Sequence, residues 1–162
     1  MKYRAGYVSN SSSSSFIVAF PHVPKDVDDV RQILFGDSET FSSPYGDECW
    51  GVKEVASIVF DDIKKQKPND FSSLVDSLRG GWFEGALDFN HDCFKNKDGE
   101  IDWGKYEAAN LKVVEKIALD FAKENKGSAL YVFHYEDDTR IGSAMEQGGL
   151  FDSLEHKKTS YH

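Results

Sequence analysis

Residues 11–20 read SSSSSFIVAF, five serines that lead without a break into five apolar residues, and Pro21 follows them. A short apolar run that ends at a proline is typical of a buried strand, so we expect a strand near 16–20. Polyserine is usually a flexible linker, because it has no side chains to bury. Its direct junction with a strand also allows the serine-rich segment 1–15 to be packed on the sheet or to flank it.

A second strand is predicted at 129–136, which reads ALYVFHYE. This segment is rich in the aromatic and β-branched side chains that strands favour. Because side chains alternate between the two faces of a strand, His134 and Glu136 would share one face and the three aromatic side chains the other. Residues 154–161 alternate enough to predict a third, edge strand.

Helical spacing of apolar residues predicts about four helices, the longest near 103–125. The other three are expected between Pro24 and Gly36, over 52–65, and between Asn69 and Gly80. Strand, helices, strand and strand indicate a small antiparallel or mixed sheet with helices packed on it. The expected fold class is therefore α+β, in a single domain over 1–162. The segment 37–50 is loop-like, and 82–100 shows no clear period.

The chain is acidic, with a formal net charge of −9 and a pI of about 5.0. Affinity for nucleic acids comes mostly from Lys and Arg that neutralise phosphates, and no basic run is present. The composition therefore argues against non-specific nucleic-acid binding and against attraction to an anionic membrane. No apolar stretch approaches a membrane span, and no secretory signal is recognisable. We expect a cytoplasmic protein in which Cys49 and Cys93 are buried free thiols.

The C-terminal third carries histidines and a carboxylate that could meet in space. His134 lies in the second predicted strand, Glu146 follows it, and His156 and His162 lie in or beside the edge strand. Such a group could hold a divalent metal, so a metal-dependent hydrolase is one hypothesis. No H-E-x-x-H or similar motif supports it, and the same residues are typical of solvated loop and edge positions.

The serine-rich segment is a second candidate site. A row of hydroxyl and amide groups near one arginine could hold an anion such as a phosphate. A serine nucleophile would need a base beside it, and no G-x-S-x-G motif is present. The residues of the hypothetical anion site are Arg4, Asn10, Ser11, Ser12, Ser13, Ser14 and Ser15.

Residues 96–102 read NKDGEID and look like part of a calcium-binding loop. With Gly99 at the invariant sixth position, Phe94 takes the place of the first carboxylate and Lys105 that of the bidentate glutamate. These two departures favour a turn followed by the start of a helix.

The opening R-x-G-Y-V-S-N-S-S-S-S-S-F-I-V, residues 4–18, closely resembles one shared by many uncharacterised small proteins of tailed bacteriophages and some bacteria. The ending from Met145 to His162, M-E-x-G-x-x-F-x-x-L-x-H-x-x-x-S-x-H, looks like a tail that accompanies this opening in some of them. The resemblance implies a phage or prophage accessory protein that acts in the host cytoplasm, and it implies no catalytic residues. Because both ends match, we expect the serine segment, the strand 129–136 and the tail to lie side by side.

These observations favour a bacteriophage accessory protein that binds or sequesters a host component. The component would be a nucleotide-like small molecule held by the serine segment, or a host protein held by the acidic surface. Without an enzyme motif, binding is favoured over catalysis. The alternatives are the metal-dependent hydrolase, marked by a bound metal, and a minor virion structural protein, marked by a large apolar self-association surface.

Overall fold

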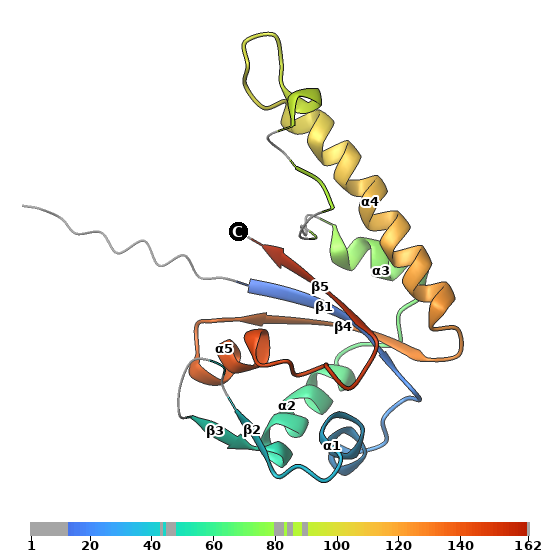
Figure 1. Cartoon of the computed structure of the whole chain (residues 1–162). Coiled ribbons are helices and arrows are strands. Elements are labelled where there is room, and N and C mark those ends of the chain that lie inside the picture. The colour runs from blue at the N-terminus through green and yellow to red at the C-terminus, as the bar shows by residue number, and fades with distance from the viewer. Residues whose placement is uncertain are drawn as a thin grey trace, which may run out of the picture.

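The serine-rich end of the chain supplies the central strand of the sheet. β1 (Ser13–Phe20) lies between β4 (Ala129–Glu136) and β5 (His156–Tyr161) and is antiparallel to both (Figure 1). β1 begins at Ser13 rather than near 16, because the last three serines continue the ladder on both sides. Ser13–Ser15, the described part of the serine segment, therefore lie beside β4 and the tail, as expected. The computed structural model describes residues 13–42, 44, 48–79, 83, 86–88 and 91–161.

One face of β1 presents the side chains of Phe16, Val18 and Phe20, each at most 5% exposed. These side chains belong to a core shared with three helices and a short hairpin. Figure 1 shows these elements on the same side of the sheet. They are α1 (Val27–Phe35), β2 (Thr40–Ser42), β3 (Cys49–Gly51), α2 (Val52–Lys64) and α5 (Arg140–Gln147).

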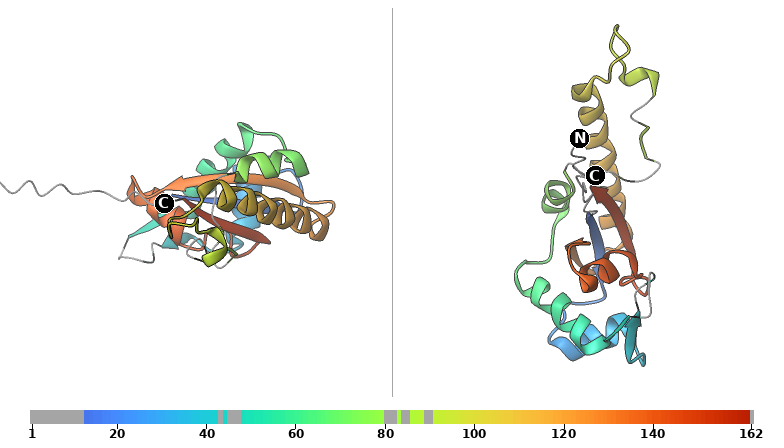
Figure 2. Two further views of the ribbon diagram at one scale, coloured as in Figure 1. Left: turned by 90° about the horizontal axis from the view of Figure 1, so that it is seen from above. Right: turned by 90° about the vertical axis from the view of Figure 1, so that its left-hand side faces the viewer.

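The other face of β1 presents Ile17 and Ala19 to a second core. This core is closed by α3 (Phe71–Leu78) and α4 (Trp103–Glu124), which pack on the opposite side of the sheet from α1 and α2. The N-terminal half of α4 extends beyond the sheet and carries the short 3-10 helix η1 (Asp92–Phe94) at its far end (Figure 2). The described residues thus form an α+β fold with helices on both faces of a three-stranded sheet.

Two segments contain structure that the sequence did not predict. The expected loop over 37–50 includes β2 and β3, in which Phe41 pairs with Trp50. Strands of three residues are too short to show a period, so no pattern revealed them. The described residues also contain five α-helices instead of about four, because the tail forms α5. The Thr139 side chain begins α5 by accepting a hydrogen bond from the backbone N–H of Gly142.

The turn predicted at 96–102 is confirmed. The side-chain oxygen of Asn96 accepts hydrogen bonds from the backbone N–H groups of Asp98 and Glu100, at 2.9 Å each. Asp102 then caps α4 by accepting from the backbone N–H of Lys105. The Asn96 and Asp102 oxygens that a calcium loop would direct to a cation are used to close the turn and to begin the helix.

The expectation of buried thiols is wrong. Cys49 and Cys93 are both exposed and free. Cys49 lies on the outer hairpin, and Cys93 lies in η1 at the far end of α4, so neither position is covered by the two cores.

Candidate functional site

Two adjacent serines of β1 direct their side chains to opposite faces of the sheet. The Ser14 hydroxyl donates to Oε1 of Glu146 at 2.9 Å, on the α5 face. The Ser15 hydroxyl lies 3.0 Å from Nδ1 of His134, on the α4 face. Ser14 and Ser15 are 1% and 3% exposed, so both serines are buried; the Ser14 contact is sheltered from water, and the Ser15 contact is partly buried. The alternation along β1 therefore creates two separate polar sites rather than one row of hydroxyls.

The site on the α5 face is built around Glu146, in the last turn of α5. This residue is only 3% exposed, although carboxylates are seldom buried without a partner. The hydrogen bond from Ser14 supplies one partner. Next along the chain, Gly148 approaches the hairpin so closely that a β-carbon there would lie 2.7 Å from the ring of Phe41. The absence of a side chain at Gly148 thus lets α5 end against β2.

A pocket of about 570 Å³ opens beside Glu146. Its walls come from β1, from the end of α5 and the turn after it, from β5, and from the hairpin region. Small-molecule sites usually have volumes of a few hundred cubic ångströms, so the pocket is large enough for one. It is lined by Phe16, Ser42, Pro44, Glu146, Gln147, Gly148, Gly149, Leu150, Phe151, Asp152, His156 and Lys158.

Lys158 provides a fixed positive charge in this pocket. Its ammonium donates to the backbone carbonyl of Glu146 at 3.0 Å and to Oε1 of Gln147 at 3.3 Å. The same ammonium lies 5.5 Å from the centre of the Phe16 ring. No carboxylate of the described residues forms an ion pair with Lys158, so neutral oxygens and a ring hold this charge. An ammonium has three N–H donors, which leaves one for a further acceptor.

His156 lies beside Lys158 on the same face of β5. Its Nδ1 is 3.0 Å from the backbone carbonyl of Leu154. Because a carbonyl only accepts, Nδ1 carries the proton and the neutral ring keeps an acceptor at Nε2. The ring centre lies 6.4 Å from that of Phe16 and 6.5 Å from that of Phe151. His156 thus adds a polar edge to the aromatic wall of the pocket.

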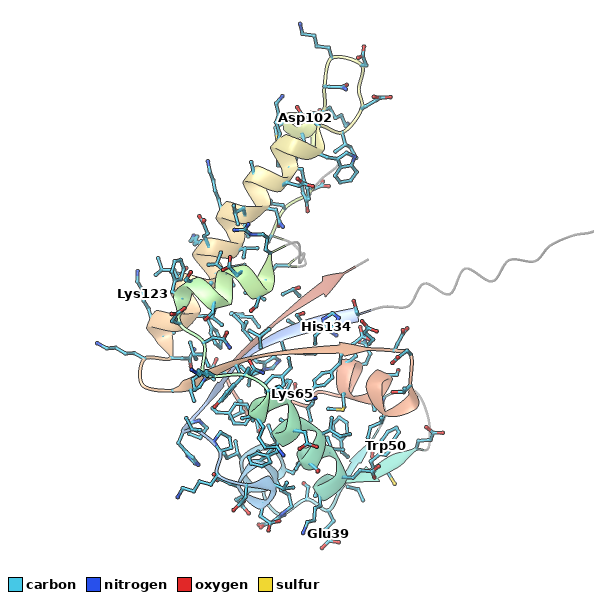
Figure 3. The ribbon with its side chains drawn as sticks, turned by 180° about the vertical axis from the view of Figure 1, so that it is seen from behind. Glu39, Trp50, Lys65, Asp102, Lys123 and His134 are labelled. Carbon is cyan, nitrogen blue, oxygen red and sulfur yellow. The ribbon has the colours of Figure 1, made fainter. Side chains whose placement is uncertain are left out.

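The site on the α4 face is a row across the three strands. His134, Ser15 and Thr159 are register partners on β4, β1 and β5. His134 also lies 3.3 Å, through Nε2, from Oε1 of Glu136. The Thr159 hydroxyl is buried and has no hydrogen-bond partner in the described part of the chain. Figure 3 labels His134 at the sheet, between α4 and α2.

The four residues of the hypothetical metal site are not all brought together. His134 contacts Ser15 on the α4 face, whereas Glu146 and His156 line the pocket on the α5 face. The sheet therefore separates His134 from the other two. Across the described residues, no group of three or more His, Cys, Asp or Glu side chains is placed to hold a metal ion. His162 lies outside the described residues.

The hypothetical anion site of the serine segment is described only in part. Ser13, Ser14 and Ser15 belong to β1, where the last two face Glu146 and His134. Neither serine forms a hydrogen bond with an arginine or lysine side chain in the described part of the chain. The remaining residues of that hypothesis, Arg4, Asn10, Ser11 and Ser12, lie outside the described residues.

Sequence reasoning missed Lys158 and Thr159, two residues central to these sites. A signal for Lys158 was present, because it shares the period-two face of β5 with His156. Thr159 lies on the alternate face, opposite Ser15. Its importance follows from that pairing, which joins segments far apart in the sequence.

Comparisons with protein-family models, with curated proteins and with solved structures gave no match for this chain. In the part of the chain that the structure describes, no helix is both long enough and apolar enough to cross a membrane.

Proposed function

We propose that this protein binds and sequesters a small nucleotide-like anion in the pocket beside Glu146. The observation that carries the proposal is the Lys158 ammonium, which lines the pocket and has no carboxylate partner among the described residues. A half-buried cation held only by neutral groups attracts an anionic ligand more strongly than a solvated lysine does. A phosphate group is the ligand that suits the remaining N–H donor.

The rest of the pocket favours a nucleotide-like molecule over a simple inorganic anion. Phe16 and Phe151 line the pocket, so part of its wall is aromatic, which suits a planar ring. Glu146 lines the same pocket, and a carboxylate there can accept hydrogen bonds from the N–H groups of a base. An anionic group near Lys158 and N–H donors near Glu146 are both features of a nucleotide.

The biological setting of the proposal rests on the resemblance of the two chain ends to small phage proteins. In that setting the protein is a phage accessory factor of the host cytoplasm, and the nucleotide-like anion is the host component that it removes. The net charge of −9 is compatible with a small, enclosed anion, although it opposes long nucleic acids that must lie along an extended surface.

The test compares two neighbouring lysines that β5 directs to opposite faces. Isothermal titration with the common ribonucleoside monophosphates and triphosphates would measure binding to native protein, to Lys158→Gln and to Lys157→Gln. Loss of a charge-assisted hydrogen bond removes about 1.5–3 kcal/mol, so we expect Lys158→Gln to weaken binding about 10- to 100-fold. Lys157→Gln removes the same charge from the exposed, opposite face and should bind as native protein does.

Two results would count against the proposal. If native protein bound none of the nucleotides, and released none on denaturation, the pocket would not be a nucleotide site. If both variants bound nucleotide equally weakly, the loss would reflect the removal of any positive charge. Binding would then not depend on the pocket.

A further inference from the structure

The polar row on the α4 face contains a serine, a histidine and a carboxylate in hydrogen-bonded sequence. Ser15 Oγ lies 3.0 Å from His134 Nδ1, and His134 Nε2 lies 3.3 Å from Glu136 Oε1. Ser15 is on β1, and the other two are on β4, two positions apart and on the same face. This site is on the opposite face of the sheet from the nucleotide pocket and does not depend on it.

The contacts determine which nitrogen of His134 can act as a base. An ionised carboxylate only accepts hydrogen bonds. The neutral ring of His134 therefore carries its proton on Nε2 and donates a hydrogen bond from this N–H to Glu136. Nδ1 is then the acceptor for the Ser15 hydroxyl. This is the tautomer that a general base needs, and a carboxylate that fixes it is the orienting group of serine hydrolases.

A hydroxyl donor stands on the other side of the serine. Thr159 is the register partner of Ser15 on β5, and side chains of directly paired residues lie about 4.5–5.5 Å apart at their β-carbons. Its hydroxyl is buried, and no group in the described residues forms a hydrogen bond with it. A buried hydroxyl without a partner costs free energy, which an acceptor oxygen at this position would relieve.

We propose that Ser15 is the nucleophile of an acyl-transfer site that hydrolyses small esters. The Ser15 oxygen forms a bond with the ester carbonyl carbon while its proton passes to Nδ1 of His134. Thr159 donates a hydrogen bond to the carbonyl oxygen, on which negative charge develops. The carbon–oxygen bond to the leaving alcohol then breaks, and that alcohol takes the proton from His134. Water then loses a proton to His134 and its oxygen bonds to the acyl carbon. The bond from that carbon to Ser15 Oγ breaks, Oγ takes the proton from His134, and the acid is released.

Burial of the serine defines the class of ester. Ser15 and Thr159 are 3% and 1% exposed, so the acyl group must be short. The His134 and Glu136 side chains are 47% and 52% exposed, so the leaving alcohol can reach solvent past them. An acetyl ester with a good leaving group fits both conditions, and p-nitrophenyl acetate is the probe of choice.

The experiment measures release of p-nitrophenol and locates the acetyl group by fragmenting the labelled peptides in a mass spectrometer. On native protein we expect a burst of product and one acetyl group on Ser15. Locating the group on unaltered protein needs no variant, so misfolding cannot obscure the result. Acetyl groups only on lysines or on the exposed Ser72 would overturn the proposal, because they would reflect accessibility without activation.

Variants then separate the roles. Ser15→Ala should abolish the burst, whereas the control Ser72→Ala should retain it. His134→Gln should lower the acylation rate about 100-fold or more, which is the usual contribution of a general base. Thr159→Val should lower it about 100-fold, as loss of an oxyanion donor does. Full activity of His134→Gln, or an unchanged burst in Ser15→Ala, would reject the site.

Glu136 is a positioning residue, because it acts through His134. Glu136→Gln should lower kcat and leave KM unchanged, since the amide can present its N–H to Nε2 and favour the wrong tautomer. A change in KM alone would mean that Glu136 affects substrate binding and does not position His134. That result would exclude Glu136 from the proposed site.

Discussion

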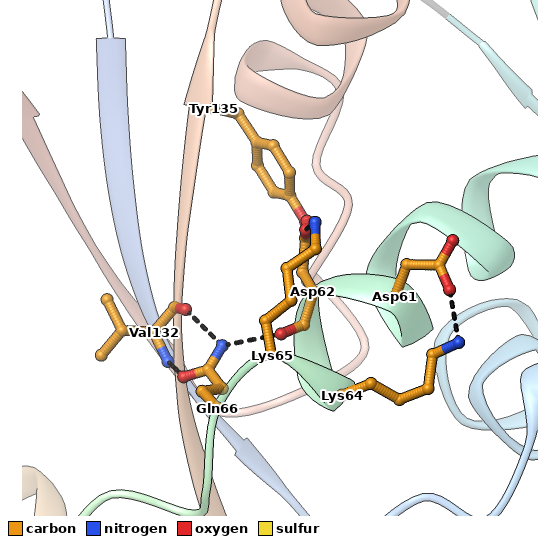
Figure 4. Close-up of polar contacts among 7 residues, drawn as sticks. All are labelled: Asp61, Asp62, Lys64, Lys65, Gln66, Val132 and Tyr135. Atoms are coloured by element: carbon orange, nitrogen blue, oxygen red, sulfur yellow. Dashed lines mark hydrogen bonds and ion pairs between the residues drawn. The ribbon is translucent and has the colours of Figure 1, made fainter.

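Tyr135, on β4, is an ionisable residue whose side chain is buried. It is 7% exposed, and its ring stacks with those of Phe133 and Phe151. Its hydroxyl reaches Oδ2 of Asp62 at 3.5 Å (Figure 4). Burial is the main effect that disfavours the phenolate, and the negative charge of Asp62 adds to it. Together they raise the pKa of Tyr135 well above its ordinary value.

This shift predicts a loss of stability in alkaline solution. A group whose pKa is higher in the folded than in the unfolded chain stabilises the fold below its unfolded pKa and loses that contribution as the pH rises. Tyrosine in the unfolded chain titrates near 10.0, so the free energy of unfolding should fall above that pH. Urea denaturation at about pH 9 and pH 11 should show a smaller alkaline loss for Tyr135→Phe than for native protein.

Tyr106→Phe is the matched control, because burial raises the pKa of Tyr106 less than that of Tyr135. We expect its alkaline loss to stay close to that of native protein. Equal losses in native protein and in Tyr135→Phe would show that Tyr135 ionises without penalty and would contradict its burial.

For single residues, the sequence predicted the face of the strand on which a side chain lies, but not the side chains that it contacts there. Alternation along 129–136 correctly separated His134 and Glu136 from the aromatic side chains. The contacts of Ser14 and Ser15 were beyond such reasoning, since they depend on α5 and β4, which follow more than a hundred residues later. The base that a serine nucleophile requires is present, but only the register of β1 with β4 reveals it.

Among the elements, β4 has an outer edge that Gln66 and Asn69 close over residues 130–132. Gln66 donates from Nε2 to the carbonyl of Val132 at 2.8 Å and accepts from the N–H of Val132 at 3.2 Å (Figure 4). Asn69 donates its backbone N–H to the carbonyl of Leu130 at 2.7 Å. The Gln66 amide thus takes the place of a peptide group of a neighbouring strand, and it blocks the pairing that open edges invite.

Gln66→Ala should therefore destabilise the protein. It removes the two hydrogen bonds to Val132, together with those that join the Gln66 side chain to Asp62 and Asn69. The Val132 N–H and carbonyl then lose their partner, at a cost of about 1–3 kcal/mol. Gln32→Ala, on the exposed surface of α1, should change stability by no more than about 0.5 kcal/mol. Urea denaturation of both variants measures the difference. If Gln66→Ala were as stable as Gln32→Ala, water would be replacing the Gln66 amide at the edge of β4.

The elements with clear periodicity were predicted well and the short ones were not. α2, α3 and α4 lie within a few residues of their expected ranges, because each carries an apolar stripe that packs on a core. The three-residue strands β2 and β3 have no room for a period. α5 was missed because its sequence, RIGSAMEQ, contains glycine and serine and has few apolar residues.

At the scale of the molecule, β1 joins two cores that otherwise lie on opposite sides of the sheet. Phe16, Val18 and Phe20 enter the core with α1 and α2, and Ile17 and Ala19 enter the core with α3 and α4. One continuous strand therefore supplies side chains to both cores. If either core loosens, β1 loses part of the packing that keeps it in register, so we expect the other core to loosen with it.

Cooperative unfolding of the two cores follows from this arrangement. Phe151→Ala removes a ring from the first core, and Leu74→Ala removes a side chain from the second; each should cost several kcal/mol, about 3–5 and 2–5 respectively. Phe71→Ala, at a side chain that is 42% exposed, should cost little. Hydrogen exchange followed by mass spectrometry should show α2 and α4 losing protection together in both core variants, because global unfolding exposes both. Selective loss in α2 for Phe151→Ala, and in α4 for Leu74→Ala, would instead mean that the two cores unfold separately and that β1 does not couple them.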